Sequence, residues 1–269
     1  MGVLNVTPDS FSDGGEYVSM DAAIAHAHAM VDEGAAVIDI GGESTRPGAV
    51  PVPTGTELQR VVPVVERLAE ELAGSDVRIS VDTRHAAVAD AALDAGATIL
   101  NDVSASLWEV AADHGAGWIA MHMKGDPSTM QDDPDYGDVV AEVVEFLTDR
   151  ASAGSAAGVD EVWIDPGLGF GKTATHNLAL LADIDRIVAT GWPVVVGTSR
   201  KSTMGLLSAR SDARAGIAGS DESRPTPTDD RREASLATAT WAMARGVDMV
   251  RVHDVRAHAR AALVVGGEI

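Results

Sequence analysis

The sequence predicts a single (β/α)₈ barrel over residues 1–269, on three observations. Eight short apolar runs alternate with longer amphipathic stretches along the chain. Most runs are almost continuously apolar, which is typical of parallel strands that are covered on both faces. The length of 269 residues also suits one barrel of this kind. An open, doubly wound sheet is the alternative that this pattern leaves.

The expected strands are rich in Val and Ile, and each is followed by Gly or polar residues. In chain order they are 2–6, 36–40, 78–82, 98–102, 117–122, 161–165, 193–197 and 248–253.

The expected helices carry apolar residues at a spacing of three or four, as a helix with one buried face requires. Residues 20–33 show this pattern, and Gly34 is a plausible end signal. Residues 56–72 repeat it, with Pro63 expected to kink the helix or to delay its start. The remaining helices are expected at 84–95, 106–114, 137–157, 174–190, 229–245 and 254–265.

Two connections are longer than the short loops of a barrel. Residues 41–55 form a loop rich in Gly and Pro. Residues 208–230 are polar and rich in Pro, Ser and Asp, and we interpret them as an exposed, mobile excursion within the seventh crossover.

Composition excludes several classes of function. The formal charge of −21 argues against nucleic acid as a partner, because binding to phosphates needs a basic surface. The absence of cysteine excludes disulfides, thiolate metal sites and a cysteine nucleophile. The chain starts without a secretory signal and has no long apolar segment, so we expect a cytoplasmic protein with no membrane span.

Each apolar run ends in a polar side chain, and in a barrel these ends meet on the face that carries active sites. The residues are Asn5, Asp39, Asp82, Asn101, Asp102, His122, Asp165, Ser199, Arg200, Lys201, Arg251 and His253. Any one of them could be a helix cap or a turn residue, but capping alone does not explain eight coincidences at the same end. Asp39 and Asp82 lie between apolar residues, where burial without a hydrogen-bonding partner is unfavourable. A ligand with donor groups would satisfy them.

Cations gather on the same predicted face, at Arg46, Arg200, Lys201, Arg251 and His253. Barrels often bind phosphate after strands seven and eight, so these residues indicate an anionic, phosphorylated substrate. We expect structural roles for the other histidines, which lack metal-ligand spacing: His26, His28, His85, His114, His176 and His258. A weakly held Mg²⁺ that bridges substrate phosphates would leave almost no motif.

The stretch "DPGLGFGKT", residues 165–173, superficially matches a nucleotide-binding loop. That motif needs Gly five residues before its second Gly, and Pro166 occupies the position here. The stretch therefore does not predict a nucleotide-binding loop, and we expect Lys172 to be peripheral.

Taken together, the motifs resemble the dihydropteroate synthase family over essentially the whole chain. They are "GVLNVTPDSFSDGG", "DIGGESTRPGA", "SVDT", "ND", "MHMKGDPSTMQ", "DPGLGFGKT", "TSRKS" and "RVHD", in that order. The resemblance implies a barrel that joins 6-hydroxymethyl-7,8-dihydropterin pyrophosphate to p-aminobenzoate, giving 7,8-dihydropteroate and pyrophosphate in folate synthesis. It also implies Mg²⁺ as cofactor and a homodimer.

The resemblance implies three groups of site residues. The pterin ligands would be Asp82, Asn101, Met121, Asp165 and Lys201. The pyrophosphate ligands would be Asn5, Thr45, Arg46, Arg251 and His253, with Asn5 also contacting Mg²⁺. The p-aminobenzoate pocket and its mobile loops would carry Phe11, Asp13, Thr45, Pro47, Gly169, Phe170 and Ser202.

The mechanism that the resemblance implies is dissociative: pyrophosphate leaves first, and the arylamine nitrogen attacks a stabilised pterin methyl cation. Asp82, Asp165, Lys201, Arg251 and His253 are the expected catalytic group. Two alternatives are a pterin-binding methyltransferase module and a catalytically silent pterin-binding paralogue. The positions expected to contact sulfonamides look unaltered, so we expect these inhibitors to bind.

Overall fold

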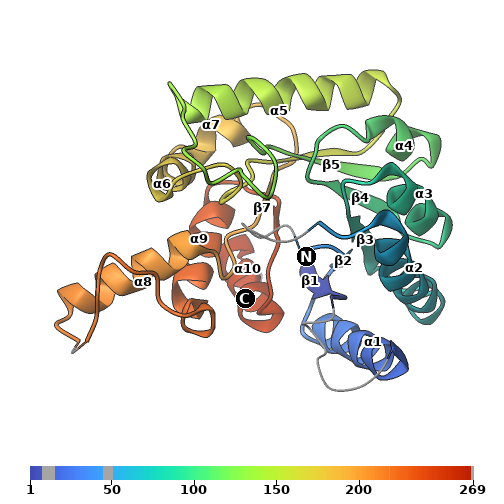
Figure 1. The fold of residues 1–269 in the computed structure, drawn as a ribbon, viewed down its shortest axis with the longest axis horizontal. Coiled ribbons are helices and arrows are strands. Elements are labelled where there is room, and N and C mark those ends of the chain that lie inside the picture. The colour runs from blue at the N-terminus through green and yellow to red at the C-terminus, as the bar shows by residue number, and fades with distance from the viewer. Residues whose placement is uncertain (8–15, 45–50, 218, 268–269) are drawn as a thin grey trace.

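The protein is built around eight short parallel strands (Figure 1). The computed structural model describes residues 1–7, 16–44, 51–217 and 219–267, and for 16–19 the backbone alone. The strands are β1 Gly2–Asn5, β2 Val37–Gly41, β3 Arg78–Asp82, β4 Ile99–Asp102, β5 Gly117–Met121, β6 Val162–Asp165, β7 Val195–Val196 and β8 Met249–Val250. All eight fall at the expected runs, so the predicted strand order is confirmed.

The strands close into a barrel rather than ending as an open sheet. Strands β1 to β6 pair in chain order, and β7 pairs with β8. Single bridges join the two sheets, between Ile164 and Val194 on one side and between Gly2 and Val252 on the other. The N–H of Val3 donates to the carbonyl of Val252 at 3.0 Å, which completes the ring. The barrel prediction is therefore correct.

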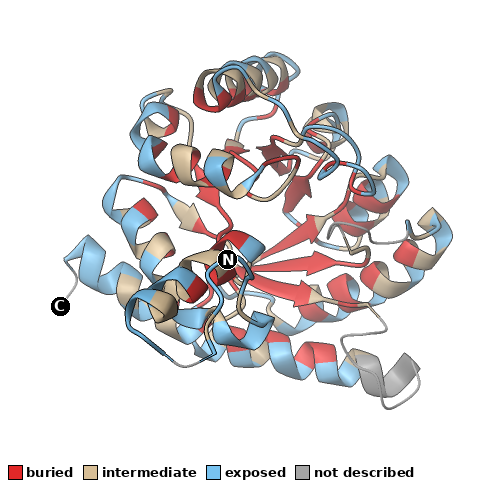
Figure 2. Ribbon diagram, turned by 60° about the vertical axis from the view of Figure 1, so that its left-hand side comes forward, coloured by how far each residue is buried: buried red, intermediate tan, exposed pale blue. Residues whose placement is uncertain are grey.

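Helices surround the strands and pack on their outer face (Figures 1 and 2). They are α1 Glu16–Asp32, α2 Thr54–Glu71, α3 Ala86–Asp94, α4 Trp108–Asp113, α5 Val139–Ala156, α6 Ala174–Ala182, α7 Ile184–Val188, α8 Ser202–Arg214, α9 Arg232–Ala244 and α10 Val255–Gly266. The helix expected at 174–190 is divided at Asp183 into α6 and α7. Pro63 lies inside α2 and does not delay its start, which is at Thr54.

The predicted excursion at 208–230 is wrong at its beginning. Residues 208–214 are the second half of α8, which buries Met204 and Ala209. The sequence hides this helix because Ser, Thr and Gly have weak helix propensity and the exposed residues are polar. The rest of the segment is mostly exposed, with a 3₁₀ turn at Thr228–Asp230. Its backbone is attached to α8 by the N–H of Thr226, which donates to the carbonyl of Gly205.

Alternation along each strand separates two apolar regions. One face of each strand points outward and packs against the helices, as the completely buried Leu4, Ile38 and Trp118 do. The strands are accordingly mostly buried (Figure 2). The other face points into the barrel, where Val37, Ile99, Ile119 and Val195 form a separate cluster. The inward positions nearer the carboxyl ends of the strands are polar, and they form the candidate site.

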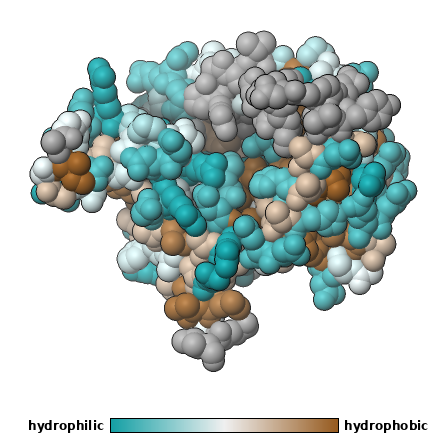
Figure 3. All heavy atoms as spheres, turned by 90° about the horizontal axis from the view of Figure 1, so that it is seen from below, coloured by the Kyte–Doolittle hydropathy of each residue, from teal (hydrophilic) through white to brown (hydrophobic). Residues whose placement is uncertain are grey.

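The face of the molecule in Figure 3 is largely hydrophilic, with apolar residues in small scattered patches. No helix among the described residues is long and apolar enough to cross a membrane.

Candidate active site

The site begins with polar residues that lie side by side at the carboxyl ends of β1 to β4. In the strand register Asn5 is paired with Gly41, Gly41 with Asp82, and Asp82 with Asn101. Because these residues have the same phase of the strand alternation, their side chains share the interior of the barrel. Met121 and Asp165 are paired in the same way at the ends of β5 and β6.

An arginine that follows β8, on the other side of β1, joins these residues. The Nε of Arg251 donates to Oδ2 of Asp39 at 2.6 Å, and its Nη2 donates to Oδ2 of Asp82 at 2.6 Å. Asn101 donates from Nδ2 to the same oxygen of Asp39 at 3.1 Å. Arg251 follows β8 in sequence, so these contacts connect side chains of β2, β3 and β4 with the residue directly after β8.

Two carboxylate oxygens of this cluster have no partner. The Oδ1 atoms of Asp39 and Asp82 are buried and accept no hydrogen bond among the described residues. An unsatisfied buried acceptor is unfavourable by about 1–3 kcal/mol, so each is a ready position for a ligand N–H. Asp39 is fully buried at the centre of the cluster, and the site assignments from sequence omitted it. The signal was present, since an aspartate interrupts the apolar run 36–40.

Burial changes the ionisation of these groups. It raises the pKa of Asp82 to about 7, against the opposing effect of Arg251, and Asp39 raises it further. Burial also raises the pKa of Asp165, while Lys201 opposes the change. For Lys201, burial lowers the pKa to about 8. The site therefore holds an acid and a base that titrate near neutral pH, a feature typical of functional sites.

The loop after β6 forms the next part of the site. Asp165 accepts from the N–H of Gly167 at 2.7 Å, which fixes the carboxylate at the start of the loop. The ammonium of Lys201 donates to the carbonyl of Leu168 and lies 4.7 Å from the centre of the Phe170 ring. Gly169 lies against the Lys201 side chain, because a Cβ built there would be 3.4 Å from its Cδ. The loop and Lys201 thus form one surface beside Asp165.

Lys172 is not peripheral, so that prediction is wrong. Its side chain is 2% exposed, and its Nζ lies 2.8 Å from Nδ1 of His122. The same Nζ donates to the carbonyls of Gly167 and Phe170 at 3.0 and 3.1 Å. Burial lowers the pKa of Lys172, and burial together with Lys172 lowers the pKa of His122 to about 3. His122 is therefore neutral and accepts from the amine.

The cations expected after strands seven and eight divide into two kinds. Arg200 pairs with Asp254, with Nη2 2.9 Å from Oδ1, so its guanidinium is already engaged. Its backbone has a φ of 60°, an uncommon conformation for a residue other than glycine. His253 lies with Nδ1 3.0 Å from the hydroxyl of Ser199. Among the predicted cations, Arg251, Lys201 and His253 lie at the carboxyl ends of the strands. Arg200 instead connects the segment after β7 to the segment after β8 through its ion pair with Asp254.

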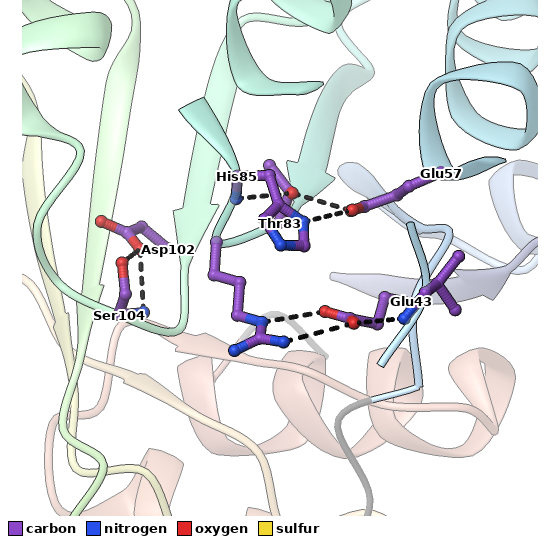
Figure 4. A network of polar contacts seen from close by, with 8 residues as sticks. Glu43, Glu57, Thr83, His85, Asp102 and Ser104 are labelled. Carbon is purple, nitrogen blue, oxygen red and sulfur yellow. Dashed lines mark hydrogen bonds and ion pairs between the residues drawn. The ribbon is translucent and has the colours of Figure 1, made fainter. Parts of the chain in front are cut away.

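A second polar network lies beside the site and was not predicted (Figure 4). Glu57 of α2 is fully buried, accepts from the hydroxyl of Thr83 at 2.7 Å and lies 2.6 Å from Nδ1 of His85. Glu43 accepts from Nε of Arg84 at 3.0 Å. Although the ligand atoms of Glu43, Glu57 and His85 lie within 4.8 Å of one another, the two carboxylates already have partners. We interpret the network as fixing the segment that follows Asp82.

Asp102 has a structural role, unlike its neighbour Asn101. One of its oxygens accepts from the N–H of Ser104 at 2.8 Å (Figure 4). The other accepts from the N–H groups of Ser106 and Leu107, both at 2.7 Å. This pattern caps the turn before α4, which is the alternative explanation considered for polar residues at strand ends.

A divalent cation is compatible with one corner of the site. A Cβ built at Gly41 would be 3.8 Å from Oδ1 of Asn5 and 3.7 Å from Oδ2 of Asp82, so both oxygens face the same space. Mg²⁺ prefers oxygen ligands and commonly keeps several waters while bridging phosphates. The amide oxygen of Asn5 suits that role.

Several expected site residues are not part of the described structure. Phe11, Asp13, Thr45, Arg46 and Pro47 lie outside the described residues. Ser202 is described and is the first residue of α8, directly after Lys201. The structure therefore brings together the expected residues of the strand ends, the loop after β6 and the start of α8.

Comparisons with known proteins agree with this geometry. The model of the family described as "Pterin binding enzyme" matches residues 1–253. A dihydropteroate synthase of Mycobacterium leprae is 45% identical, over 99% of this chain and 92% of its own. The solved dihydropteroate synthase of Xanthomonas albilineans with 4-aminobenzoic acid has a TM-score of 0.86 and 42% identity, covering 100% of this chain and 92% of its own. That of Yersinia pestis in a sulfonamide complex has a TM-score of 0.86 and 41% identity, covering 100% and 93%.

Proposed function

The chain belongs to the dihydropteroate synthase family of pterin-binding enzymes, and from this we propose how its residues divide the work of the reaction. It is a transferase that condenses 6-hydroxymethyl-7,8-dihydropterin pyrophosphate with p-aminobenzoate to give 7,8-dihydropteroate and pyrophosphate. The observation that carries the assignment of roles is the buried cluster of Asp39, Asp82 and Arg251, in which two acceptor oxygens receive no hydrogen bond from any described residue.

The pterin ring binds in the mouth of the barrel, between Asp82, Asn101, Asp165 and Lys201. A pterin presents an edge of ring and amino N–H groups, which pair with carboxylate and amide acceptors. The free Oδ1 atoms of Asp39 and Asp82 and the buried carboxylate of Asp165 support this placement. Met121, which is 5% exposed at the end of β5, supplies an apolar surface on which the ring packs.

The pyrophosphate binds toward β8 and β1. Arg251 uses Nε and Nη2 for the two aspartates, which leaves Nη1 as a donor for an anion. His253, Thr45 and Arg46 complete the anion site in our proposal, and Asn5 would hold Mg²⁺ through its amide oxygen. Bound Mg²⁺ supplies charge neutralisation of the leaving pyrophosphate. Few positive groups suffice here because they are concentrated, although the protein as a whole is strongly acidic.

The p-aminobenzoate binds between the loop after β6 and the first turn of α8. Phe170 and the stem of Lys201 offer apolar surface to the aromatic ring, and Gly169 lets the backbone approach closely. Ser202 opens a helix of 13 residues, whose free N–H groups favour a carboxylate. Phe11, Asp13 and Pro47 cover the pocket in this proposal.

The reaction is dissociative in this proposal. The bond between the pterin methylene carbon and the pyrophosphate oxygen breaks first, and the pair of electrons leaves with pyrophosphate. Asp39, Asp82 and Asp165 then face a cationic pterin, which buried carboxylates stabilise through charge. The arylamine nitrogen attacks the methylene carbon and afterwards loses a proton. Positioning and charge account for the rate, and no protein nucleophile takes part.

The test of the proposed roles is turnover with purified protein, dihydropterin pyrophosphate, Mg²⁺ and p-aminobenzoate. We expect dihydropteroate and pyrophosphate in equal amounts, and competition by a sulfonamide against p-aminobenzoate. Pyrophosphate release without any dihydropteroate would contradict the arylamine site. Pterin binding without turnover would instead favour the silent paralogue.

We also propose a homodimer, which the family resemblance implies. Exposed apolar side chains support it, notably Trp241 on α9, 45% exposed, and Leu263 and Val264 on α10. Sedimentation equilibrium distinguishes a dimer from a monomer directly.

A further inference from the structure

Five successive carbonyl groups in the loop after β6 each accept a hydrogen bond from a side chain. Loop carbonyls ordinarily face water, so a fully occupied run is unusual. The donors and acceptors are Lys172 to Gly167 and Phe170, Lys201 to Leu168, Gln131 to Gly169, and Tyr136 to Gly171. We call residues 167–171 the framed loop. Its backbone is held from the loop after β5, from its own end and from α8.

Lys172 is the central donor of this frame. Its Nζ contacts four acceptors: the carbonyls of Gly167, Phe170 and His122, and Nδ1 of His122. His122 is itself held in place, with the edge of Phe146 packed against it at 4.9 Å between ring centres. An amine with several N–H groups can connect acceptors that converge on one point, which no single backbone N–H can do.

The framed loop lies directly against the segment that follows β5. Gly167 and Gly171 both have a φ of 61°. A Cβ at these positions would lie 1.9 Å from the carbonyl oxygen of His122 and 2.2 Å from that of Lys124. The loop is therefore pressed against the segment after β5, and Lys172 occupies the space that remains between them.

The other side of the framed loop carries the groups of the proposed arylamine pocket. The N–H of Gly167 holds Asp165, the carbonyl of Leu168 accepts from Lys201, and the ring of Phe170 lies against the same ammonium. A shift of this backbone would thus move the pocket and Lys201 together. A displacement of about 1 Å in a site can lower a rate about 100-fold.

We propose that Lys172 is a positioning residue for p-aminobenzoate: it holds the framed loop so that Phe170 and Lys201 form the arylamine side of the site. The inference depends on the proposed function, because it assumes that this side receives p-aminobenzoate. Lys172 itself is buried and contacts no substrate in this role. Its effect passes through the main-chain carbonyls of Gly167 and Phe170.

The experiment compares Lys172→Met with Lys124→Met. Methionine keeps the length of the buried side chain but donates no hydrogen bond. Lys124 is the comparison, since it is an exposed lysine of the neighbouring loop and donates to the carbonyl of Asp135 instead of the framed loop. It reaches the frame only indirectly, through the ring of Tyr136, whose centre lies 4.2 Å from its Nζ. Both variants are measured for KM of p-aminobenzoate, kcat, affinity for dihydropterin pyrophosphate by calorimetry, and hydrogen exchange of the amides of residues 165–173.

For Lys172→Met we expect KM of p-aminobenzoate to rise about tenfold or more, as expected for losing about one hydrogen bond to a charged group. Sulfonamide inhibition should weaken in parallel, while affinity for dihydropterin pyrophosphate should fall by a smaller factor, because only Asp165 and Lys201 of the proposed pterin ligands contact the framed loop. Exchange of the framed loop should be faster. The Lys124→Met variant should raise KM of p-aminobenzoate by no more than about two- to threefold, because it touches the frame only through Tyr136. An unchanged KM in a folded Lys172→Met protein would overturn the proposal, as would an equal loss of pterin affinity, which indicates general disruption.

Two milder variants test the same idea if Lys172→Met does not fold. Gln131→Ala and Tyr136→Phe each remove one side-chain donor from the framed loop at its rim. Each should raise KM of p-aminobenzoate about two- to threefold without changing pterin affinity. An unchanged KM in both would contradict the inference. The wild-type protein could also show no turnover while the variants still exchange the amides of the framed loop faster. That result would support the frame and refute the proposed function.

Discussion

The two halves of the barrel interior differ in chemistry, although the same strands build both. Near the amino ends of the strands, Val37, Ile99, Ile119 and Val195 form an apolar plug. Near the carboxyl ends the same positions of the alternation carry Asp39, Asp82, Asn101, Asp165 and Arg251, which we call the charged half. In strand β2 the change occurs between Val37 and Asp39, two residues apart.

Residues that stabilise the fold and residues that bind the ligand are thus only a few positions apart on the same strands. The apolar plug is stabilised by dispersion contacts and by the exclusion of water, and its side chains have no hydrogen-bonding groups to satisfy. The charged half keeps acceptor oxygens at Asp39 and Asp82 that have no hydrogen-bond partner within the described part of the chain, which is unfavourable until a ligand binds. The plug therefore stabilises the barrel, while the charged half gives up stability to bind substrate. Four changes test this division.

Arg251→Met should have the largest effect, on stability. Removing the guanidinium leaves Asp39 and Asp82 buried without a counter-ion, and breaking such a pair lowers the free energy of unfolding by about 3–5 kcal/mol. Urea unfolding near neutral pH measures it. Arg245→Met is the control, because its ion pair with Asp185 is exposed and should contribute less than about 1 kcal/mol. Equal losses in the two variants would refute the division.

Asp82→Asn should lower the affinity for dihydropterin pyrophosphate about 10- to 100-fold, the effect of losing a charged hydrogen-bond acceptor. The fold should remain, because the amide has nearly the same shape and size. Calorimetry measures the affinity. Asp94→Asn, at an exposed carboxylate on α3, is the matched control. Unchanged binding in Asp82→Asn would remove this residue from the pterin site.

The pH dependence of kcat/KM should be bell-shaped. The pKa of Asp82, raised to about 7 by burial, makes the acceptor carboxylate form as pH rises through that value, so activity increases. The pKa of Lys201, lowered to about 8 by burial, means that its positive charge is lost as pH rises further, so activity decreases. Each limb should approach about a tenfold change per pH unit. A profile that is flat through neutral pH would contradict both assignments.

Ile119→Val should have the smallest effect of the four, and it tests the apolar plug instead of the charged half. Loss of one methyl group from a fully buried position lowers the free energy of unfolding by about 0.5–1.5 kcal/mol. Neither KM nor kcat should change measurably, because Ile119 belongs to the apolar plug. A tenfold change in kcat/KM would show that the two halves are mechanically coupled.

The strands and their polar ends could be predicted because both depend on local pattern. Continuous apolar runs predict the positions of the strands. An aspartate at the end of such a run, such as Asp82 or Asp165, can be identified directly from the sequence. Asp39 was visible too, but its role depends on Arg251, which is 212 residues away in sequence. A pairing over that distance is set by barrel closure, which no local window contains.

Lys172 and Glu57 could not be predicted for a similar reason. Lys172 follows a glycine-rich turn and has the composition of a surface residue; its burial results from carbonyls of two separate loops that converge on it. Glu57 precedes an apolar face of α2, and only the position of Thr83 and His85 after β3 makes burial of a carboxylate favourable. Residue type predicts exposure for both, and tertiary partners reverse it.

The close approach of Gly167 and Gly171 to the main chain of the preceding loop also limits how this region can evolve. A side chain at either position would collide with a peptide oxygen, of His122 or Lys124. Because every residue type carries that oxygen, no compensating substitution in the facing segment can make room. A residue other than glycine at position 167 or 171 therefore requires the backbone of one of the two loops to move.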